Sequence, residues 1–377
     1  MTLIDKDVKM KFIFDRDSLF KEMSIAQEII ATKNVASILS NVLLIAENNT
    51  LTIKATDIKI NFETKIPVEI QQEGMTTVFC DKFVGILNLI ETGDVEFSQE
   101  NSIVVIRPLT GKKQIFKLNS MASDKFPEFA SAENVPYFDV PVQEFKEMIM
   151  HTIFAVSTDG NRIFMNGIYM EKKGDNLVMV ATDSRRLAYI AKPLCGGVAD
   201  FESAIVPPKI FEVLLKRMPS EGSLSIAIVD KVIFFRFGNY NFTSVLIDGQ
   251  YPNYQRVIPE EQKYSFEVDK KDLLSALKSA SLFVEQKSNR VYFDLTQNQL
   301  TIRSQGSEVG DANVDIPCEY DGENVEMAFN YMIVEQPMKV INTDKIRFEF
   351  SEYMKAVTIK SVPEADFIHI VMPMQRE

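Results

Sequence analysis

The segment ATDSRRLAYI, from Ala181 to Ile190, contains the turn from which the organisation of the chain can be worked out. Strand-forming residues from Leu177 to Ala181 precede it, and we expect them to form an edge strand that runs into a turn at residues 182–184. Aspartate and serine favour such a turn because their side chains bond to nearby backbone N–H groups. The same strand pattern and the same three letters occur earlier in LTIKATD, which ends at Asp57. Because an alternating strand precedes both copies, the pattern indicates an internal repeat.

Three copies of the repeat begin with the same spacing of four apolar residues. The first two alternate, as in a half-buried strand, and the last two lie four residues apart, as on one face of a helix. A hairpin, a strand that leads into a second helix, and a final strand pair follow in each copy. The four residues are Phe12, Phe14, Leu19 and Met23 in the first copy, Phe138, Val140, Phe145 and Ile149 in the second, and Phe266, Val268, Leu273 and Leu277 in the third.

The repeat is about 125 residues long, which suits a domain with its own core and is too long for a solenoid repeat. Two helices are expected on one face of an antiparallel sheet in each copy, so the predicted fold class is α+β with three tandem copies of one domain. Turn residues cluster between the copies, at 122–136 and 248–263. The expected domains are 1–131 (with 1–9 as an N-terminal extension and Met10 as an alternative start), 132–255 and 256–377.

The composition excludes several classes of protein. A formal net charge of −12 argues against a protein that grips nucleic acid through bulk positive charge. Cys80, Cys195 and Cys318 lie far apart without a CxxC spacing, so we expect a reducing compartment, no disulfides and no metal site. The N-terminal residues are too charged for a signal peptide, and no apolar run approaches the roughly 20 residues that span a bilayer. These features predict a soluble cytoplasmic protein that needs no cofactor.

The motifs of the common enzyme classes are missing from the sequence. The chain has two histidines, His151 and His369, and contains no HExxH, GxSxG, GxGxxG or Walker-type motif. We therefore expect a binding or scaffolding protein without catalysis. Ten basic residues fall on or near the six expected helices, and composition alone favours solvated helix faces that also carry glutamate. The ten are Lys21, Lys33, Lys82, Lys146, Lys209, Lys216, Arg217, Lys270, Lys271 and Lys278.

Four longer segments together carry a family resemblance. They are KFIFDRDSLFKEM near the N-terminus, NGIYME followed by VATDSRRLA, LIDGQYPNYQRVIP, and VMPM near the C-terminus. In this order, from about Met10 to Met374, they resemble the bacterial DNA polymerase III beta subunit, the sliding clamp family. The resemblance implies a head-to-tail homodimer whose six domains form a ring around duplex DNA, with helices lining the hole and sheets forming the outer wall. It also implies a processivity factor that tethers the replicative polymerase to its template.

A ring would account for the acidic composition. A closed ring holds DNA by topology and needs little affinity for phosphate, since each strong contact would have to be remade at every step of sliding. The resemblance therefore favours a DNA-facing role for some of the helix lysines, against the indication of composition alone. The alternative is a multidomain peptide-binding scaffold that does not encircle DNA. A ring predicts a stable dimer and a basic inner surface, whereas a scaffold predicts neither.

The resemblance also implies a groove for partner proteins. The family binds a short, mostly apolar peptide carried by the polymerase alpha subunit, the clamp loader, repair polymerases and mismatch-repair proteins, in a groove between the second and third domains. An apolar pocket there can be walled by Leu187, Val257, Ile370 and Met372. An oxygen at its rim can be bound by Arg186 and Arg256. The matching positions are Met165, Thr182, Ser184, Arg185, Arg186, Leu187, Pro252, Arg256, Val257, Ile370, Met372, Pro373 and Met374.

Two further sets of positions follow from the resemblance. Phe116 and Leu118 of the first domain match residues that meet Leu282 and Phe283 of the third domain in the neighbouring subunit. The positions that match DNA-facing residues are Lys33 and Phe164.

Four features depart from the family pattern. Ser184 and Arg185 stand where glycine and histidine are usual, so the peptide preference is expected to differ. The chain closes with Gln375–Glu377 where an arginine and a leucine are common, and Ile333 replaces a tyrosine that often lines the groove. Pro337 falls inside the expected last helix, where it should kink the helix or mark its start.

Overall fold

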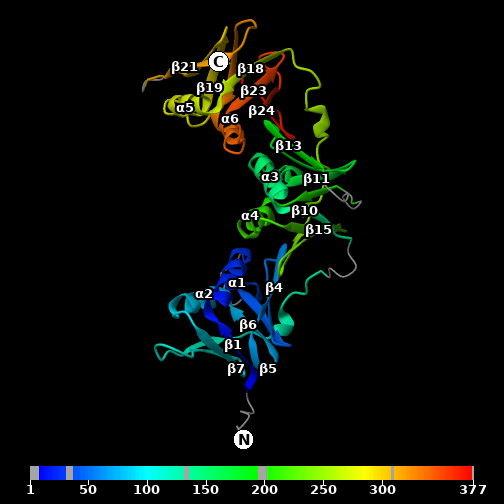
Figure 1. Cartoon of the computed structure of the whole chain (residues 1–377), viewed down its shortest axis with the longest axis vertical. Coiled ribbons are helices and arrows are strands. Elements are labelled where there is room, and N and C mark those ends of the chain that lie inside the picture. The colour runs from blue at the N-terminus through cyan, green and yellow to red at the C-terminus, as the bar shows by residue number, and fades with distance from the viewer. Residues whose placement is uncertain are drawn as a thin grey trace. The chain divides into compact units, whose positions relative to one another are not determined.

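The computed structural model describes residues 8–30, 37–130, 136–193, 201, 203–306 and 310–375. Its elements repeat three times along the chain, each time as a strand, a helix, a group of strands, a second helix and a final group of strands (Figure 1). The fold is α+β with three tandem domains, as the sequence predicts. All twelve residues of the repeated apolar pattern are buried, so the same spacing forms the core of each copy.

The first copy contains β1 (Val8–Asp15), α1 (Arg16–Ile29), β2 (Asn41–Glu47), β3 (Thr50–Thr56), β4 (Ile60–Pro67), β5 (Glu69–Gln72), β6 (Gly74–Phe79), α2 (Cys80–Leu89), β7 (Asp94–Glu100), β8 (Ile103–Pro108) and β9 (Phe116–Asn119). The second contains β10 (Phe138–Pro141), α3 (Val142–Thr152), β11 (Ile168–Lys173), β12 (Asn176–Thr182), β13 (Arg186–Pro193), β14 (Ala204–Val206), α4 (Pro208–Arg217), β15 (Ser223–Val229), β16 (Val232–Phe237) and β17 (Tyr240–Val245). The third contains β18 (Tyr264–Asp269), α5 (Lys270–Ser281), β19 (Arg290–Thr296), β20 (Gln299–Ser304), β21 (Asn313–Glu319), β22 (Val325–Asn330), α6 (Tyr331–Met338), β23 (Lys345–Phe350), β24 (Val357–Val362) and β25 (Phe367–Val371).

Side-chain caps begin the first helix of the first and third copies. The carboxylate of Asp15 accepts a hydrogen bond from the backbone N–H of Ser18 at 2.8 Å, and Asp269 accepts one from the N–H of Lys271 at 2.8 Å. Such a cap satisfies a backbone donor that has no partner within the helix and contributes about 1 kcal/mol. In these two copies the helix therefore begins directly after the first strand.

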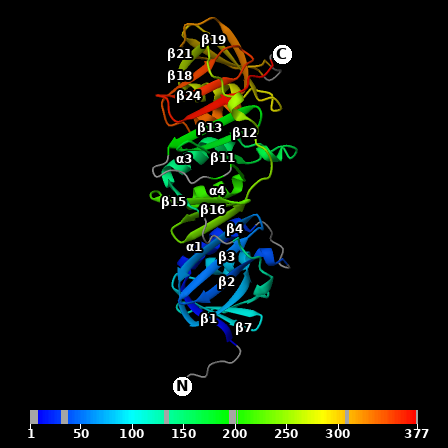
Figure 2. The same ribbon diagram turned by 90° about the vertical axis from the view of Figure 1, so that its right-hand side faces the viewer.

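The chain divides into two compact units. The described residues of Met1–Pro141 and Glu212–Leu246 form unit 1, and those of Val142–Phe211 and Ile247–Glu377 form unit 2. Among the described residues, unit 1 holds a five-stranded sheet in the order β5-β1-β7-β8-β9 and an eight-stranded sheet in the order β10-β15-β16-β17-β4-β3-β2-β6. Figure 2 shows β2, β3 and β4 side by side in this second sheet.

Unit 2 is built on one long sheet. Its described strands follow the order β14-β11-β12-β13-β25-β24-β23-β18-β21-β20-β19-β22. In both units a strand from the end of one copy pairs with a strand from the hairpin region of the preceding copy, β17 with β4 and β25 with β13. We call these two pairs the first and the second junction.

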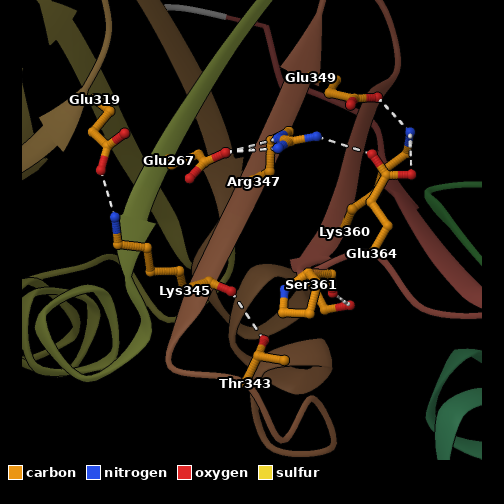
Figure 3. A network of polar contacts seen from close by, with 10 residues as sticks. Glu267, Glu319, Thr343, Lys345, Arg347, Glu349, Lys360, Ser361 and Glu364 are labelled. Atoms are coloured by element: carbon orange, nitrogen blue, oxygen red, sulfur yellow. Dashed lines mark hydrogen bonds and ion pairs between the residues drawn. The ribbon is translucent and has the colours of Figure 1, made fainter.

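Ion pairs cross the exposed face of the long sheet (Figure 3). The guanidinium of Arg347 on β23 lies 2.8 Å from the carboxylate of Glu267 on β18 and 2.9 Å from that of Glu364. Lys360 on β24 lies 3.0 Å from Glu349. Because the side chains of this network are partly exposed, each pair contributes at most about 1 kcal/mol.

One expectation about local structure is wrong. The strand that precedes the turn at 182–184 is central, because β12 pairs with β11 on one side and with β13 on the other. The residues after the turn form a second strand, which the polar pair Arg185 and Arg186 concealed in the sequence. The last helix begins at Tyr331, capped by Asn330, so Pro337 does not mark its start and lies one residue before its end. The first strand begins at Val8, inside the expected extension.

None of the helices in the described ranges is long and apolar enough to cross a membrane.

Candidate functional site

The turn of the second copy is closed by its own side chains. The carboxylate of Asp183 accepts hydrogen bonds from the backbone N–H groups of Arg185 (2.9 Å) and Arg186 (3.1 Å), and the hydroxyl of Thr182 accepts one from the N–H of Ser184 (3.2 Å). Ser184 has a φ of 75°, in the left-handed region that favours glycine. This backbone conformation explains why the family pattern has glycine at the position of Ser184.

The first copy forms the same turn. The carboxylate of Asp57 accepts from the N–H groups of Lys59 (3.0 Å) and Ile60 (2.7 Å), and the hydroxyl of Thr56 accepts from the N–H of Ile58 (2.8 Å). Ile58 has a φ of 78°. The recurring three letters in the sequence therefore correspond to a recurring hydrogen-bonded turn.

The second junction brings two predicted groove residues together. In the pairing of β13 with β25, Leu187 lies opposite Ile370. Leu187 is 2 % exposed and Ile370 is 1 % exposed, and both belong to an apolar cluster with Val178 and Val180 of β12. The second junction therefore carries an apolar patch made by two strands from different copies of the repeat.

Two tyrosines anchor the linker to this patch. The hydroxyl of Tyr251 donates to the carbonyl of Val180 at 3.4 Å, its ring stacks on that of Tyr169 with centroids 4.7 Å apart, and the hydroxyl of Tyr254 donates to the carboxylate of Glu171. Burial raises the pKa of both linker tyrosines, so both remain neutral hydroxyls at ordinary pH. The sequence reasoning did not include Tyr251 and Tyr254 in the site, although the motif YPNY in the linker is a signal for them.

The anchored linker carries three further predicted residues. Pro252 lies between the two tyrosines, and Arg256 ends the short 3-10 helix Tyr254–Arg256. Arg256 is exposed, and Val257 is 44 % exposed. Arg256 and Val257 are thus accessible, and the backbone N–H of Val257 donates to the carbonyl of Tyr254, a member of the apolar cluster, at 2.9 Å.

The C-terminal residues are bonded to the second copy and to their own, third copy. The N–H of Met372 donates to the carbonyl of Arg185 at 2.8 Å, and the N–H of Met374 donates to the carbonyl of Ala328 at 2.7 Å. Met372 is 38 % exposed, and Pro373 is half-buried. The first bond therefore holds Met372 beside the turn at 182–184, and the second ties Met374 to β22.

Met165 approaches the turn from the other side. It ends the 3-10 helix Ile163–Met165 and is 4 % exposed. The hydroxyl of Ser184 lies 3.8 Å from the sulfur of Met165 and accepts a hydrogen bond from the guanidinium of Arg162 at 2.6 Å. A serine at this position therefore adds contacts that glycine could not make.

The two arginines of the turn differ in their surroundings. The guanidinium of Arg186 bonds to the carboxylate of Asp183 at 2.9 Å, bonds to the side-chain oxygen of Gln336 on α6, and lies 5.7 Å from the ring centre of Phe154. Burial lowers the pKa of Arg186, and the carboxylate of Asp183 opposes this shift. Arg185 is exposed. Arg186 therefore holds the turn against α6, while Arg185 faces solvent.

The remaining predicted residues are the interface and DNA-facing positions. Phe116 and Leu118 are half-buried on β9 in unit 1, whereas Leu282 and Phe283 follow α5 in unit 2. Phe164 packs against the apolar cluster of the second junction. Lys33 lies outside the described residues.

The two histidines form a buried pair without the geometry of a catalytic site. Nδ1 of His151 lies 3.2 Å from Nε2 of His369, and the rings stack 5.4 Å apart. Burial lowers the pKa of His151 to about 4 and that of His369 well below its ordinary value. Both rings are therefore neutral at physiological pH and pack α3 against β25. Within the described ranges, no three His, Cys, Asp or Glu side chains lie close enough to hold a metal ion.

Comparison with known proteins covers nearly the whole chain. Residues 10–130, 139–253 and 255–375 match the N-terminal, central and C-terminal domain models of the DNA polymerase III beta subunit. The beta sliding clamp of Treponema pallidum is 43% identical over 372 residues, which is 98% of this chain and 100% of that protein. The beta sliding clamp of Escherichia coli K12 is 27% identical over 369 residues, 97% of this chain and 100% of that protein. The crystal structure of the sliding clamp from Bacillus subtilis is similar with a TM-score of 0.93 and 25% identity, over 98% of this chain and 100% of that one.

Proposed function

Because the chain belongs to the DNA polymerase III beta sliding clamp family, a non-catalytic subunit that confers processivity, we propose that two copies close head to tail into a ring around duplex DNA. The ring tethers the replicative polymerase to its template. The observation that carries the proposal is the pattern of strand junctions in the repeat, two made within the chain and a third left open.

The open edges support the ring. By their place in the repeat, β9 corresponds to β17 and β25, and β21 corresponds to β4 and β13. Among the described strands, β9 pairs with β8 alone, and residues 313–317 of β21 pair with β20 alone. The unpaired backbone N–H and C=O groups at a strand edge can form hydrogen bonds with a strand of another chain. A second copy would supply β21 to β9 and β9 to β21, which is the head-to-tail closure that forms a ring.

The side chains near these edges agree with this arrangement. Leu282 is 78 % exposed and takes the place in the third copy that Glu28 takes in the first and Phe154 in the second. Glu28 accepts a hydrogen bond from the guanidinium of Arg217 at 2.7 Å, and the ring of Phe154 lies 5.4 Å from that of His369. The equivalent residue thus contacts the following copy at both junctions within the chain. We infer that Leu282 and Phe283 make the same contact with Phe116 and Leu118 of a second subunit.

We further propose that the second junction is the docking site for partner peptides. The buried pair of Leu187 and Ile370 is the apolar floor, and the exposed Met372 and Val257 would contact the incoming side chains. An aliphatic surface with a flexible thioether side chain beside it suits a leucine or phenylalanine anchor. The proposed partners are the polymerase alpha subunit, the clamp loader, repair polymerases and mismatch-repair proteins. For the rim we propose Arg185 and Arg256, since Arg186 is already bonded within the chain.

Truncation tests the peptide site. Deleting residues 372–377 removes the Met372 and Met374 backbone bonds and should abolish binding of a labelled apolar peptide in fluorescence anisotropy, while light scattering shows an intact dimer. The matched control is truncation after Met374, which keeps both bonds and should retain binding. Peptide affinity that survives the longer deletion would contradict the assignment.

Topology tests the ring. After loading onto nicked circular DNA by a competent loader, the protein should remain on the circle and be lost when a restriction enzyme linearises it. Equal retention on both forms would favour the scaffold that does not encircle DNA. Leu282→Ala with Phe283→Ala should give folded monomers in light scattering, whereas Ile163→Ala, another exposed aliphatic residue, should leave the dimer intact.

A further inference from the structure

We propose that the second junction selects peptides that carry a carboxylate next to their apolar anchor, and that Arg185 is the residue that makes this selection. The selection operates at the proposed peptide site and rests on that proposed function. Two exposed apolar side chains lie beside the junction, those of Met372 and Val257. Each has an exposed arginine as its immediate neighbour, so an apolar contact and a positive charge occur together twice.

The backbone fixes Arg185 beside Met372. The carbonyl of Arg185 accepts the hydrogen bond from the N–H of Met372 at 2.8 Å, and its own N–H donates to the carboxylate of Asp183 at 2.9 Å. Two residues further along the chain, Leu187 pairs with Ile370 in the apolar cluster. The backbone of Arg185 is therefore held in place next to the apolar patch, while its side chain is exposed.

Arg256 takes a similar position on the linker. It follows Tyr254, which packs in the apolar cluster, by two residues, and it directly precedes Val257. Its side chain is exposed. We assign the selection to Arg185 because two backbone bonds hold its position, whereas Arg256 ends a single turn of 3-10 helix.

The two exposed arginines have no side-chain partner within the described ranges, where their guanidinium groups make neither a hydrogen bond nor an ion pair. The carboxylates next to the turn are already matched by other arginines. Asp183 lies 2.9 Å from the guanidinium of Arg186, and Asp159 lies 3.6 Å from that of Arg162. The positive charge of the two exposed arginines is therefore not compensated by direct contact.

A carboxylate beside an apolar side chain fits this arrangement. A guanidinium binds a carboxylate through two parallel N–H···O bonds. A leucine or phenylalanine next to an aspartate or glutamate uses the apolar side chain and the neighbouring arginine at once. A nucleic acid would pair its phosphates with the arginines but would leave Met372 and Val257 against a polar backbone, so the arrangement favours a peptide.

Two pairs of labelled hexapeptides test the selection on the full-length protein. Each peptide carries a leucine–phenylalanine anchor among alanines, with aspartate or asparagine directly before the anchor in one pair and directly after it in the other. Fluorescence anisotropy should give a dissociation constant about fivefold lower for the aspartate peptide in at least one pair, as expected for an ion pair at an exposed site. This ratio should approach one at about 0.5 M salt, because salt screens exposed charges.

Substitutions assign the effect to one residue. Arg185→Met removes the charge and should reduce the ratio of the two dissociation constants below about twofold. Arg185→His makes the charge titratable, so the preference should be present at about pH 5.5 and lost at about pH 8, since the ordinary pKa of an imidazole is about 6.5. The control is Lys173→Met, which removes an exposed cation opposite Asn176, at the other end of β12 from the turn, and should leave the ratio unchanged.

Three results would overturn the selection and leave the peptide groove in place. They are equal binding within both pairs, tighter binding of the asparagine peptides, and a ratio that Arg185→Met lowers no more than Lys173→Met does. An aspartate preference that persists after deletion of residues 372–377 would place the acidic peptide at another site and would also exclude the inference. If none of the four peptides bound, the proposed groove would be lost and the selection with it.

Discussion

The two junctions share a backbone arrangement and differ in the side chains that cover it. At the first junction the facing pair is Asn61 and Thr243, joined by a hydrogen bond of 2.9 Å. At the second the pair is Leu187 and Ile370, both buried in an apolar cluster. The strand register of the repeat thus determines where a junction forms, and the side chains at a few positions decide what can bind there.

The helices that support the junctions show the same contrast. At the first junction the hydroxyl of Tyr240 on β17 donates to the carboxylate of Glu22 on α1 at 3.0 Å, and burial raises the pKa of Glu22. At the second, the neutral rings of His151 and His369 stack between α3 and β25. The first contact is a hydrogen bond from a tyrosine hydroxyl to a carboxyl group, and the second is a stack of two uncharged imidazole rings.

The largest effect is expected from exchanging the facing pair. Leu187→Asn with Ile370→Thr places the polar pair of the first junction inside an apolar cluster. Because apolar burial is lost and polar groups become buried, the free energy of unfolding should fall by about 4 kcal/mol or more. Urea unfolding of the full-length chain would measure the loss of stability, and anisotropy with an apolar peptide should show that binding is lost.

The reverse exchange is the control. Asn61→Leu with Thr243→Ile makes the first junction apolar, so peptide binding at the second junction should remain as in the unaltered protein. If the Leu187 and Ile370 variant kept its peptide affinity, or the reverse variant lost it, the facing pair would not distinguish the two junctions.

A smaller effect is expected at the arginine that bonds the turn to α6. Arg186→Met keeps the packing and removes the hydrogen bonds to Asp183 and Gln336. The free energy of unfolding should fall by about 2 kcal/mol and not more, because Asp183 still accepts hydrogen bonds from its backbone donors. The first copy has Ile60 at the equivalent place, with no such bonds. Arg185→Met, at the exposed neighbour, should leave the urea midpoint unchanged, and an equal loss in both variants would contradict the bridging role of Arg186.

The histidine pair makes stability depend on pH. Burial lowers the pKa of His151 to about 4, whereas in the unfolded chain it is near the ordinary value of 6.5, so between these values the unfolded state binds more protons. The contribution of the neutral His151 ring to the free energy of unfolding is complete above about pH 6.5. It is lost as the pH falls toward 4, by about 1.4 kcal/mol for each unit of pH. Glu147 nearby opposes the shift, and Lys192 adds to it.

The pH effect can be isolated by substitution. His151→Asn should remove about half of the loss of stability between pH 6.5 and pH 5 that urea unfolding of the unaltered chain shows, because burial also lowers the pKa of His369, which remains. Substituting Glu22, whose pKa is raised at the first junction, should leave this loss in place, because a raised carboxyl pKa lowers stability as pH rises. A His151→Asn variant with an unchanged pH profile would exclude the pair as its source.

The smallest effect concerns the two matching turns. Ile58, with a φ of 78°, is branched at Cβ and 64 % exposed, so Ile58→Gly should relieve strain and raise stability by about 1 kcal/mol. Ser184→Gly relieves similar strain but loses the hydrogen bond from Arg162, so its gain should be smaller. Thermal unfolding of the two variants would compare them, and a larger gain at Ser184 would contradict this account.

Sequence reasoning succeeded where the signal is local. The repeated apolar spacing from Phe12 predicted the strand and helix that begin each copy, because burial on one face follows directly from a period of two or of about 3.6 residues. Sequence reasoning did not find the strand after Ser184, because two arginines there hide the alternation of apolar and polar residues. It also did not find Tyr251 and Tyr254, since an aromatic residue in a linker shows its role only when the surface it covers is known.

By itself, the sequence determined the threefold repeat, the α+β class, the hydrogen-bonded turn at Asp57 and again at Asp183, and the family to which the chain belongs. Only the tertiary structure decided that Leu187 meets Ile370, that Asn61 meets Thr243, and that the edge of β9 remains unpaired among the described strands. The reason is physical: hydrophobic periodicity and turn chemistry act between near neighbours in the chain, whereas strand pairing is decided by which open edges meet after the copies have folded.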